Sequence, residues 1–144
     1  MKIVVGYLLA VVAAYVLGAV FVSQGNITAV IGMGFEITTS QRIDAMIHDV
    51  THMFDIYLPL VSIGMLIGLG FAGLINRYVP DLRFIGYVSA GFVALIAIHV
   101  ILKAVLGLSG IAPTREIMGL VLQGLAGAVG GLVFHFMTLK KHAS

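Results

Sequence analysis

Residues 42–55 concentrate side chains that could bind a metal ion. Two histidines, His48 and His52, stand four positions apart. Asp44 precedes this pair by about one helical turn and Asp55 follows it by about one turn. Residues four apart lie on the same face of a helix, so the imidazoles would lie together with a carboxylate on either side. Such a ligand set suits Zn²⁺ or Cu²⁺, and either aspartate could instead orient an imidazole without touching the metal.

The same segment predicts an amphipathic helix over about residues 40–58, capped by Thr39 and Ser40 and ended by Pro59. Its polar residues share one arc, and the opposite face holds Ile43, Met46, Ile47, Val50, Met53, Phe54 and Tyr57. Such helices are typical of the membrane–water interface. We expect the histidines and aspartates to form the solvated face of this helix, with metal binding as the alternative.

A b-type haem is the other cofactor that the histidines could hold. Bis-histidine ligation needs two imidazoles on different helices at a similar depth. His99 lies in the third long apolar segment, so it could pair with His48 or His52 from the amphipathic helix. The sequence therefore leaves three possibilities open, which are no cofactor (our expectation), haem b, or Zn²⁺ or Cu²⁺.

A small set of polar residues interrupts the long apolar segments at a similar depth, and its members are Tyr15, Ser62, His99, Lys103 and Gln123. Polar side chains inside a membrane are costly and often functional. They predict a polar cavity that opens to the outside, with the amphipathic helix as its cover. Alternatively, Gln123 and Ser62 could hydrogen-bond between helices and hold the bundle together.

The elements that position these residues are long apolar helices. The chain of 144 residues is 60% hydrophobic and 10% charged, with a mean hydropathy of +1.13. Apolar runs long enough to cross a bilayer occur near residues 3–22, 59–77, 84–106 and 116–138. We therefore predict one all-α domain over residues 1–144: a polytopic integral membrane protein with a four-helix transmembrane bundle and an outer interfacial amphipathic helix.

The basic residues predict the orientation of this bundle. One side would carry Lys2, Arg77, Arg83, Lys140 and Lys141, and the other Arg42 and Arg115. Because cytoplasmic loops are enriched in Lys and Arg, both termini are expected in the cytoplasm. The membrane we expect is the bacterial inner membrane.

Small residues recur at every fourth position of each apolar segment. Such stripes allow close helix contact in lipid, where the hydrophobic effect does not drive association. The glycines that we expect at these contacts are Gly6, Gly18, Gly64, Gly68, Gly86, Gly127 and Gly131. Four such stripes predict a tight bundle that could continue into an oligomer.

Several functional classes receive no support from the sequence. The chain has no cysteine, no glycine-rich phosphate loop and no acidic residue in the middle of an apolar segment. Its few basic residues are scattered, so nucleic acid is not an expected partner. We expect no enzyme but a non-catalytic membrane subunit or helper, surrounded by lipid and bound to copies of itself or to another membrane protein. The alternatives are the haem or metal site and a small oligomeric channel or transporter.

Overall fold

The computed structural model describes residues 1–107 and 116–139. Over these residues the chain is helical apart from short connections. The helices are α1 (Lys2–Gly32), α2 (Thr39–His52), α3 (Phe54–Ile75), a 3₁₀ turn η1 (Pro80–Leu82), α4 (Arg83–Leu106) and α5 (Ile117–Met137). Arg115, Lys140 and Lys141, which entered the topology prediction, lie outside the described residues.

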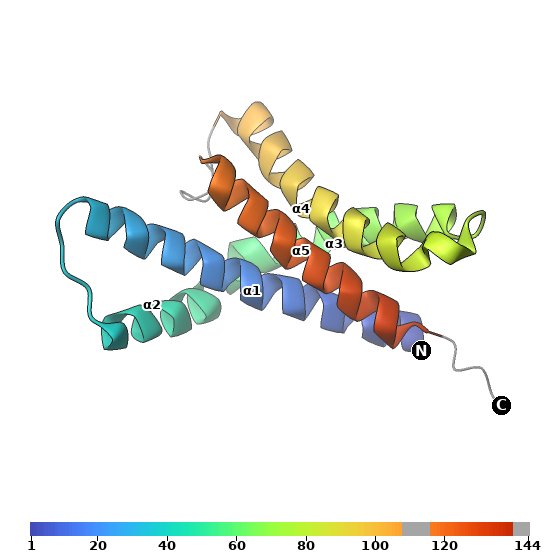
Figure 1. Cartoon of the computed structure of the whole chain (residues 1–144), viewed down its shortest axis with the longest axis horizontal. Coiled ribbons are helices and arrows are strands. Elements are labelled where there is room, and N and C mark those ends of the chain that lie inside the picture. The colour runs from blue at the N-terminus through green and yellow to red at the C-terminus, as the bar shows by residue number, and fades with distance from the viewer. Residues whose placement is uncertain (108–115, 140–144) are drawn as a thin grey trace.

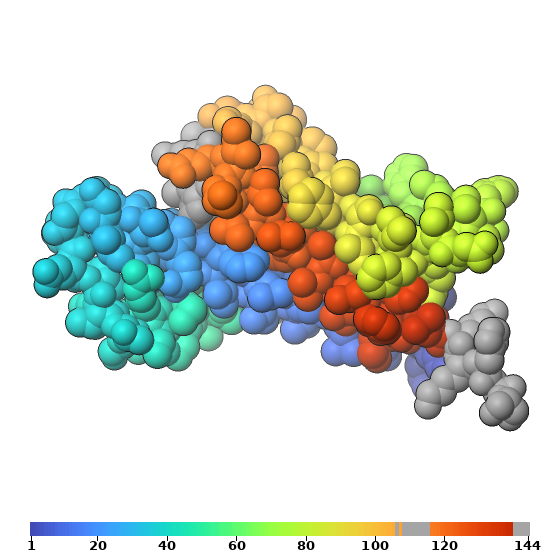
Figure 2. Space-filling model, in the orientation of Figure 1, coloured from blue at the N-terminus to red at the C-terminus, as the bar shows by residue number. Residues whose placement is uncertain are grey.

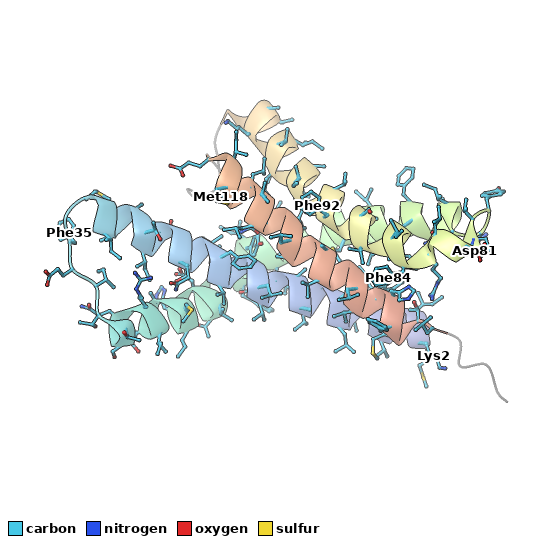
Figure 3. All side chains as sticks on the ribbon, in the orientation of Figure 1. Lys2, Phe35, Asp81, Phe84, Phe92 and Met118 are labelled. Atoms are coloured by element: carbon cyan, nitrogen blue, oxygen red, sulfur yellow. The ribbon has the colours of Figure 1, made fainter. Side chains whose placement is uncertain are left out.

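Four of these helices, α1, α3, α4 and α5, are long and apolar enough to cross a membrane. The prediction of an all-helical chain with four such segments is confirmed. Figure 1 shows all four running roughly along the long axis of the molecule. The start of α1, the turn between α3 and α4, and the end of α5 lie at one end, where Lys2 and Asp81 are labelled in Figure 3.

The first apolar helix is longer than predicted. We expected it to end near residue 22 and to be followed by a long connection, but α1 continues to Gly32. Its extension is covered by α2, so that Ser23 and Ile27 are buried. The helix ends where Gly34 takes a φ of +93°, a conformation that glycine adopts without strain.

The amphipathic helix is shorter than predicted. Its N-cap is Thr38 rather than Thr39 or Ser40, because the Thr38 hydroxyl accepts from the Gln41 amide while the Gln41 side chain accepts from the Thr38 amide. The helix ends at His52, Met53 is its C-cap, and α3 begins at Phe54. Pro59 therefore lies inside α3 and does not mark the boundary. Proline forgoes only one backbone hydrogen bond there, in the second turn.

Helix α2 runs antiparallel along the C-terminal half of α1. Arg42 donates from Nη1 to Oε1 of Gln24 over 3.1 Å. Further along both helices, the Tyr15 hydroxyl donates to the carbonyl oxygen of Val50 over 2.5 Å. We call residues 19–52 the α1–α2 hairpin. Figures 1 and 2 show that it extends as a lobe beyond the ends of α4 and α5, lying along α1 and not across the end of the bundle.

Glycines lie where the long helices approach each other. A Cβ atom added to Gly127 on α5 would overlap the carbonyl oxygen of Gly91 on α4, and one on Gly131 would overlap that of Tyr87. On α3, a Cβ atom on Gly68 would lie 2.7 Å from that of Ala94. The other glycines expected at contacts meet side chains of a neighbouring segment (Gly6, Gly18, Gly86) or a looser contact (Gly64). The sequence prediction did not include three glycines that are similarly close to a neighbouring helix, Gly91, Gly124 and Gly130.

Candidate functional site

A buried polar cluster, formed by Tyr15, Tyr57, His99 and Gln123, lies where the four long helices meet. Gln123 on α5 is only 1% exposed. Its Nε2 donates to the carbonyl oxygen of Gly18 over 3.1 Å, and its Oε1 accepts from the Tyr57 hydroxyl. A Cβ atom at Gly18 would overlap that hydroxyl. One amide therefore links α1, α3 and α5, and Gly18 makes room for the link.

The other two members of the cluster surround Tyr57. The Tyr15 ring lies 5.7 Å from the Tyr57 ring, and the His99 ring lies 6.3 Å away from it. His99 Nδ1 donates to the carbonyl oxygen of Leu95 over 2.7 Å, which leaves Nε2 without a proton in the neutral ring. That Nε2 is buried and has no hydrogen-bond partner among the described residues.

The remaining residues of the predicted polar layer stand apart from this cluster. The Ser62 hydroxyl donates within its own helix, to the carbonyl oxygen of Leu58 over 2.8 Å. Lys103 is exposed in the last turn of α4. Tyr15, His99 and Gln123 are packed inside the bundle, so the expected outward-facing polar cavity remains a prediction to which these contacts add no support.

The two histidines of α2 lie together, as their spacing predicts. The rings of His48 and His52 stack at 4.1 Å with an angle of 8° between their planes, and both side chains are exposed. Asp44 is exposed on α2, whereas Asp55 is exposed on α3 because of the break at Met53. Over residues 1–107 and 116–139, no three His, Asp or Glu side chains gather in a way that could hold a metal ion. The pair thus offers two imidazoles and no third ligand from this part of the chain.

His99 lies in a different environment from the histidines of α2. It is buried on α4 against Tyr57, whereas His48 and His52 contact each other at the surface. Because Nε2 of His99 is enclosed, a haem bound there would need space that the packed side chains now occupy. The structure therefore does not bring the proposed haem ligands to one place.

Two features of the site were not found from the sequence. Tyr57 was assigned to the apolar face of the amphipathic helix, yet its hydroxyl is the central donor of the buried cluster. Arg83 was treated only as a topology signal, but its Nη2 donates to the Thr138 carbonyl oxygen over 3.1 Å and to the Thr138 hydroxyl over 2.6 Å. These bonds cap the C-terminus of α5. An arginine directly before a predicted helix, which was expected to begin near residue 84, was the only signal for the second feature.

Comparison of the chain with known protein families, with curated proteins and with solved structures found no match in any of the three.

Proposed function

We propose that the protein is a non-catalytic integral membrane subunit or helper, which engages another membrane protein through its α1–α2 hairpin. The observation that supports this proposal most is an uncovered apolar face. Ile43 and Ile47 on α2 are 46% and 60% exposed, and Phe54 at the start of α3 is 56% exposed. An exposed apolar face of this kind marks an interaction surface.

The position of this face supports a protein partner. Val50 on α2 and Met53 at its C-cap pack against the bundle core, so part of the apolar surface in this region is already covered. Ile43 and Ile47, four positions apart, remain outside those contacts on the part of the molecule that projects beyond α4 and α5 (Figure 2). A helix with a free apolar stripe suits packing against an apolar groove or helix of a partner.

The use of the buried polar groups supports a structural role for the bundle. Tyr57 and Gln123 bond to each other, and Gln123 also bonds to the backbone of α1. Tyr15 bonds to the backbone of α2. Interhelical hydrogen bonds of this kind, together with close glycine contacts, hold membrane helices together.

We further propose that both termini face the cytoplasm and that the membrane is the bacterial inner membrane. Lys2 begins α1, and Arg77 and Arg83 flank the turn between α3 and α4. The start of α1 and this turn lie at one end of the bundle (Figure 1), which fits the enrichment of basic residues on the cytoplasmic side. Spanning α-helices are the form taken by proteins of inner membranes, whereas bacterial outer-membrane proteins are typically closed barrels.

Site-specific photocrosslinking in cells tests the proposed function. A crosslinker at Ile47 should give a discrete protein adduct, whereas one at His52, exposed about 140° further around α2, should give much less. Ile43→Ser combined with Ile47→Ser should shift the protein to a smaller complex on a native gel. Adducts with lipid alone and an unchanged complex size would overturn the proposal, and an adduct of twice the chain mass would replace the partner by a second copy.

A haem or metal site is the second candidate, because the buried Nε2 of His99 has no hydrogen-bond partner among the described residues, although a haem there would require the packed side chains around it to move. An imidazole whose Nδ1 is fixed by a backbone carbonyl presents Nε2 as a ligand, as in many metal centres. A Soret band from the purified protein that is lost in His99→Ala would establish haem. Copurified Zn²⁺ or Cu²⁺ that is lost in both His48→Ala and His52→Ala, but kept in His99→Ala, would place a metal on α2.

A further inference from the structure

A groove of about 560 Å³ opens between α1, α3 and α5 at the end of the bundle that holds Lys2. Most of its wall is apolar, with Val4 and Tyr7 from α1, Leu66 from α3 and Phe134 from α5. At one end the wall carries Arg77 and Arg83, which lie on either side of the turn between α3 and α4. The groove therefore combines an apolar channel with a positively charged mouth.

The two arginines differ in how firmly they are held. Arg83 is half-buried, bonds to Thr138 through Nη2, and lies 5.2 Å from the centre of the Tyr87 ring. A guanidinium has five N–H groups, and those on Nε and Nη1 of Arg83 have no acceptor among the described residues. Arg77 follows the C-cap of α3, Asn76, and its side chain is exposed.

In the part of the chain that the structure describes, the one ion pair within 4.0 Å joins His48 to Asp49. No described carboxylate therefore neutralises either arginine at that range.

Two glycines leave the apolar part of the groove open. Gly70 and Gly73 line it on α3. A Cβ atom added to Gly70 would meet nothing within 4 Å, and one on Gly73 would meet only the Tyr87 hydroxyl, at 3.7 Å. The gap is thus not filled by a neighbouring helix.

The length of the groove matches one leaflet of a bilayer. From Leu66 to Arg77 the wall follows α3 for roughly 16 Å, at about 1.5 Å per residue. The hydrocarbon core of a bilayer is about 30 Å thick, so one leaflet accounts for about half of that length. An acyl chain that starts at the arginine end would end near the middle of the bundle.

We propose that this groove binds an anionic glycerophospholipid, with its phosphate on Arg77 and Arg83 and one acyl chain along Gly70 and Gly73. Arginine pairs phosphate oxygens through charge-assisted hydrogen bonds. Basic pockets between membrane helices on the cytoplasmic side are typical sites for anionic headgroups. The proposal rests on the membrane insertion and orientation given under the proposed function, and it does not depend on the partner of the α1–α2 hairpin.

Native mass spectrometry of the full chain in neutral detergent tests whether the groove prefers an anionic headgroup. The protein is titrated with phosphatidylglycerol and, separately, with phosphatidylcholine of the same acyl chains. The wild-type protein should bind phosphatidylglycerol more tightly. Arg77→Gln should weaken phosphatidylglycerol binding about fivefold and phosphatidylcholine binding less, because the choline cation of that lipid already offsets the charge of the phosphate. Arg42→Gln, at the other end of the molecule, is the matched control and should change neither.

A second variant tests whether an acyl chain lies along the apolar part of the groove. Gly70→Leu fills the groove without meeting another helix, so the protein should fold normally while binding of both lipids falls. Gly32→Leu is its control, because a Cβ atom there also meets nothing within 4 Å and the residue lies far from the groove. Circular dichroism and a single elution peak verify folding of each variant.

The outcomes separate the possible occupants. Equal binding of the two lipids, or phosphatidylglycerol binding that both Arg77→Gln and Gly70→Leu leave intact, would overturn the proposal. Displacement of the lipid by inorganic phosphate alone would show a free-phosphate site instead, and a dimer that Gly70→Leu dissociates would show a second copy in the groove. The Ile47 crosslink reports the proposed partner independently of the lipid, so either proposal can fail alone, and resistance to alkaline extraction tests the membrane insertion on which both rest.

Discussion

The hydroxyl of Tyr57 donates a hydrogen bond to Oε1 of Gln123, which connects α3 to α5 across 66 positions of the sequence. The same amide donates from Nε2 to the backbone of α1 at Gly18. A single side chain therefore fixes the relative depth of three helices. Both partners are almost completely buried, so neither has water as an alternative partner.

We predict that Tyr57→Phe lowers the free energy of unfolding by about 1 kcal/mol, the size of interhelical hydrogen bonds in membranes. Gln123→Leu should cost about 2 kcal/mol, because it also leaves the buried Tyr57 hydroxyl without an acceptor. The double variant should cost less than the sum, since both changes remove the same bond. Unfolding in detergent, followed by circular dichroism, measures all three. Tyr78→Phe is the control, since Tyr78 is 89% exposed, and strictly additive costs would mean that the bond contributes nothing.

We predict that Gly127→Leu prevents normal assembly of the bundle. The leucine side chain would overlap the backbone of α4 at Gly91, which cannot move aside as a side chain can. Gly68→Leu should be severe for a similar reason, because its Cβ atom would lie 2.9 Å from the carbonyl oxygen of Ala90. Yield and elution volume after purification report the effect. Gly70→Leu, on the same helix as Gly68 but facing open space, should behave like the wild type. An equal loss of yield in all three variants would mean that the effect does not depend on the close contact of the glycine with a neighbouring helix.

We predict that Thr38→Ala destabilises the start of α2 by about 1 kcal/mol, the usual contribution of an N-cap hydroxyl. The Gln41 amide would lose its acceptor and should exchange with deuterium about fivefold faster, as hydrogen exchange with mass spectrometry can measure. Thr39→Ala is the matched control, because Thr39 lies inside the helix next to the cap. A larger loss of stability from Thr39→Ala than from Thr38→Ala would mean that Thr39 is the N-cap, as we expected from the sequence.

We predict that a reporter fused after Ser144 and one inserted at Asp81 are both active in the cytoplasm. A reporter that is active only outside the cytoplasm should be active when inserted at Phe35, because α1 lies between Phe35 and Lys2 (Figure 3). The basis is the location of Lys2, Arg77 and Arg83 at one end of the bundle. The reverse pattern of activities would invert the orientation and would move the lipid groove to the outer leaflet.

The long apolar helices could be predicted from the sequence because hydropathy over about 20 residues is a strong local signal. The starts and ends of α4 and α5 agree with the prediction to within one residue. The end of α1 could not be predicted in this way. Residues 23–32 contain Gln24 and Asn26, which resemble a connection, and they stay helical because α2 packs against them.

The composition of the buried cluster depended on contacts that local patterns do not encode. Gln123 and Tyr15 were expected at a similar depth, and both lie in the cluster. Tyr57 was missed because the helix was assumed to continue to Pro59, which assigned it to a membrane surface. Once the chain breaks at Met53, Tyr57 belongs to a different helix and faces the bundle interior. A one-residue break therefore decides whether this phenol is a surface group or a core group.

The length of α1 has a consequence for the protein in a bilayer. Its 31 residues extend over roughly 46 Å, against about 30 Å of hydrocarbon. To lie entirely within the hydrocarbon the helix would have to tilt by about 50°, beyond the usual range of up to about 40°. An upright α1, with α2 beside it, would therefore extend about 16 Å beyond the hydrocarbon, and a tilt of about 40° would still leave about 6 Å outside it. Each additional 5.4 Å or so of bilayer thickness would submerge one turn of this hairpin, so the thickness of the host membrane sets how far His48 and His52 stand from the lipid headgroups.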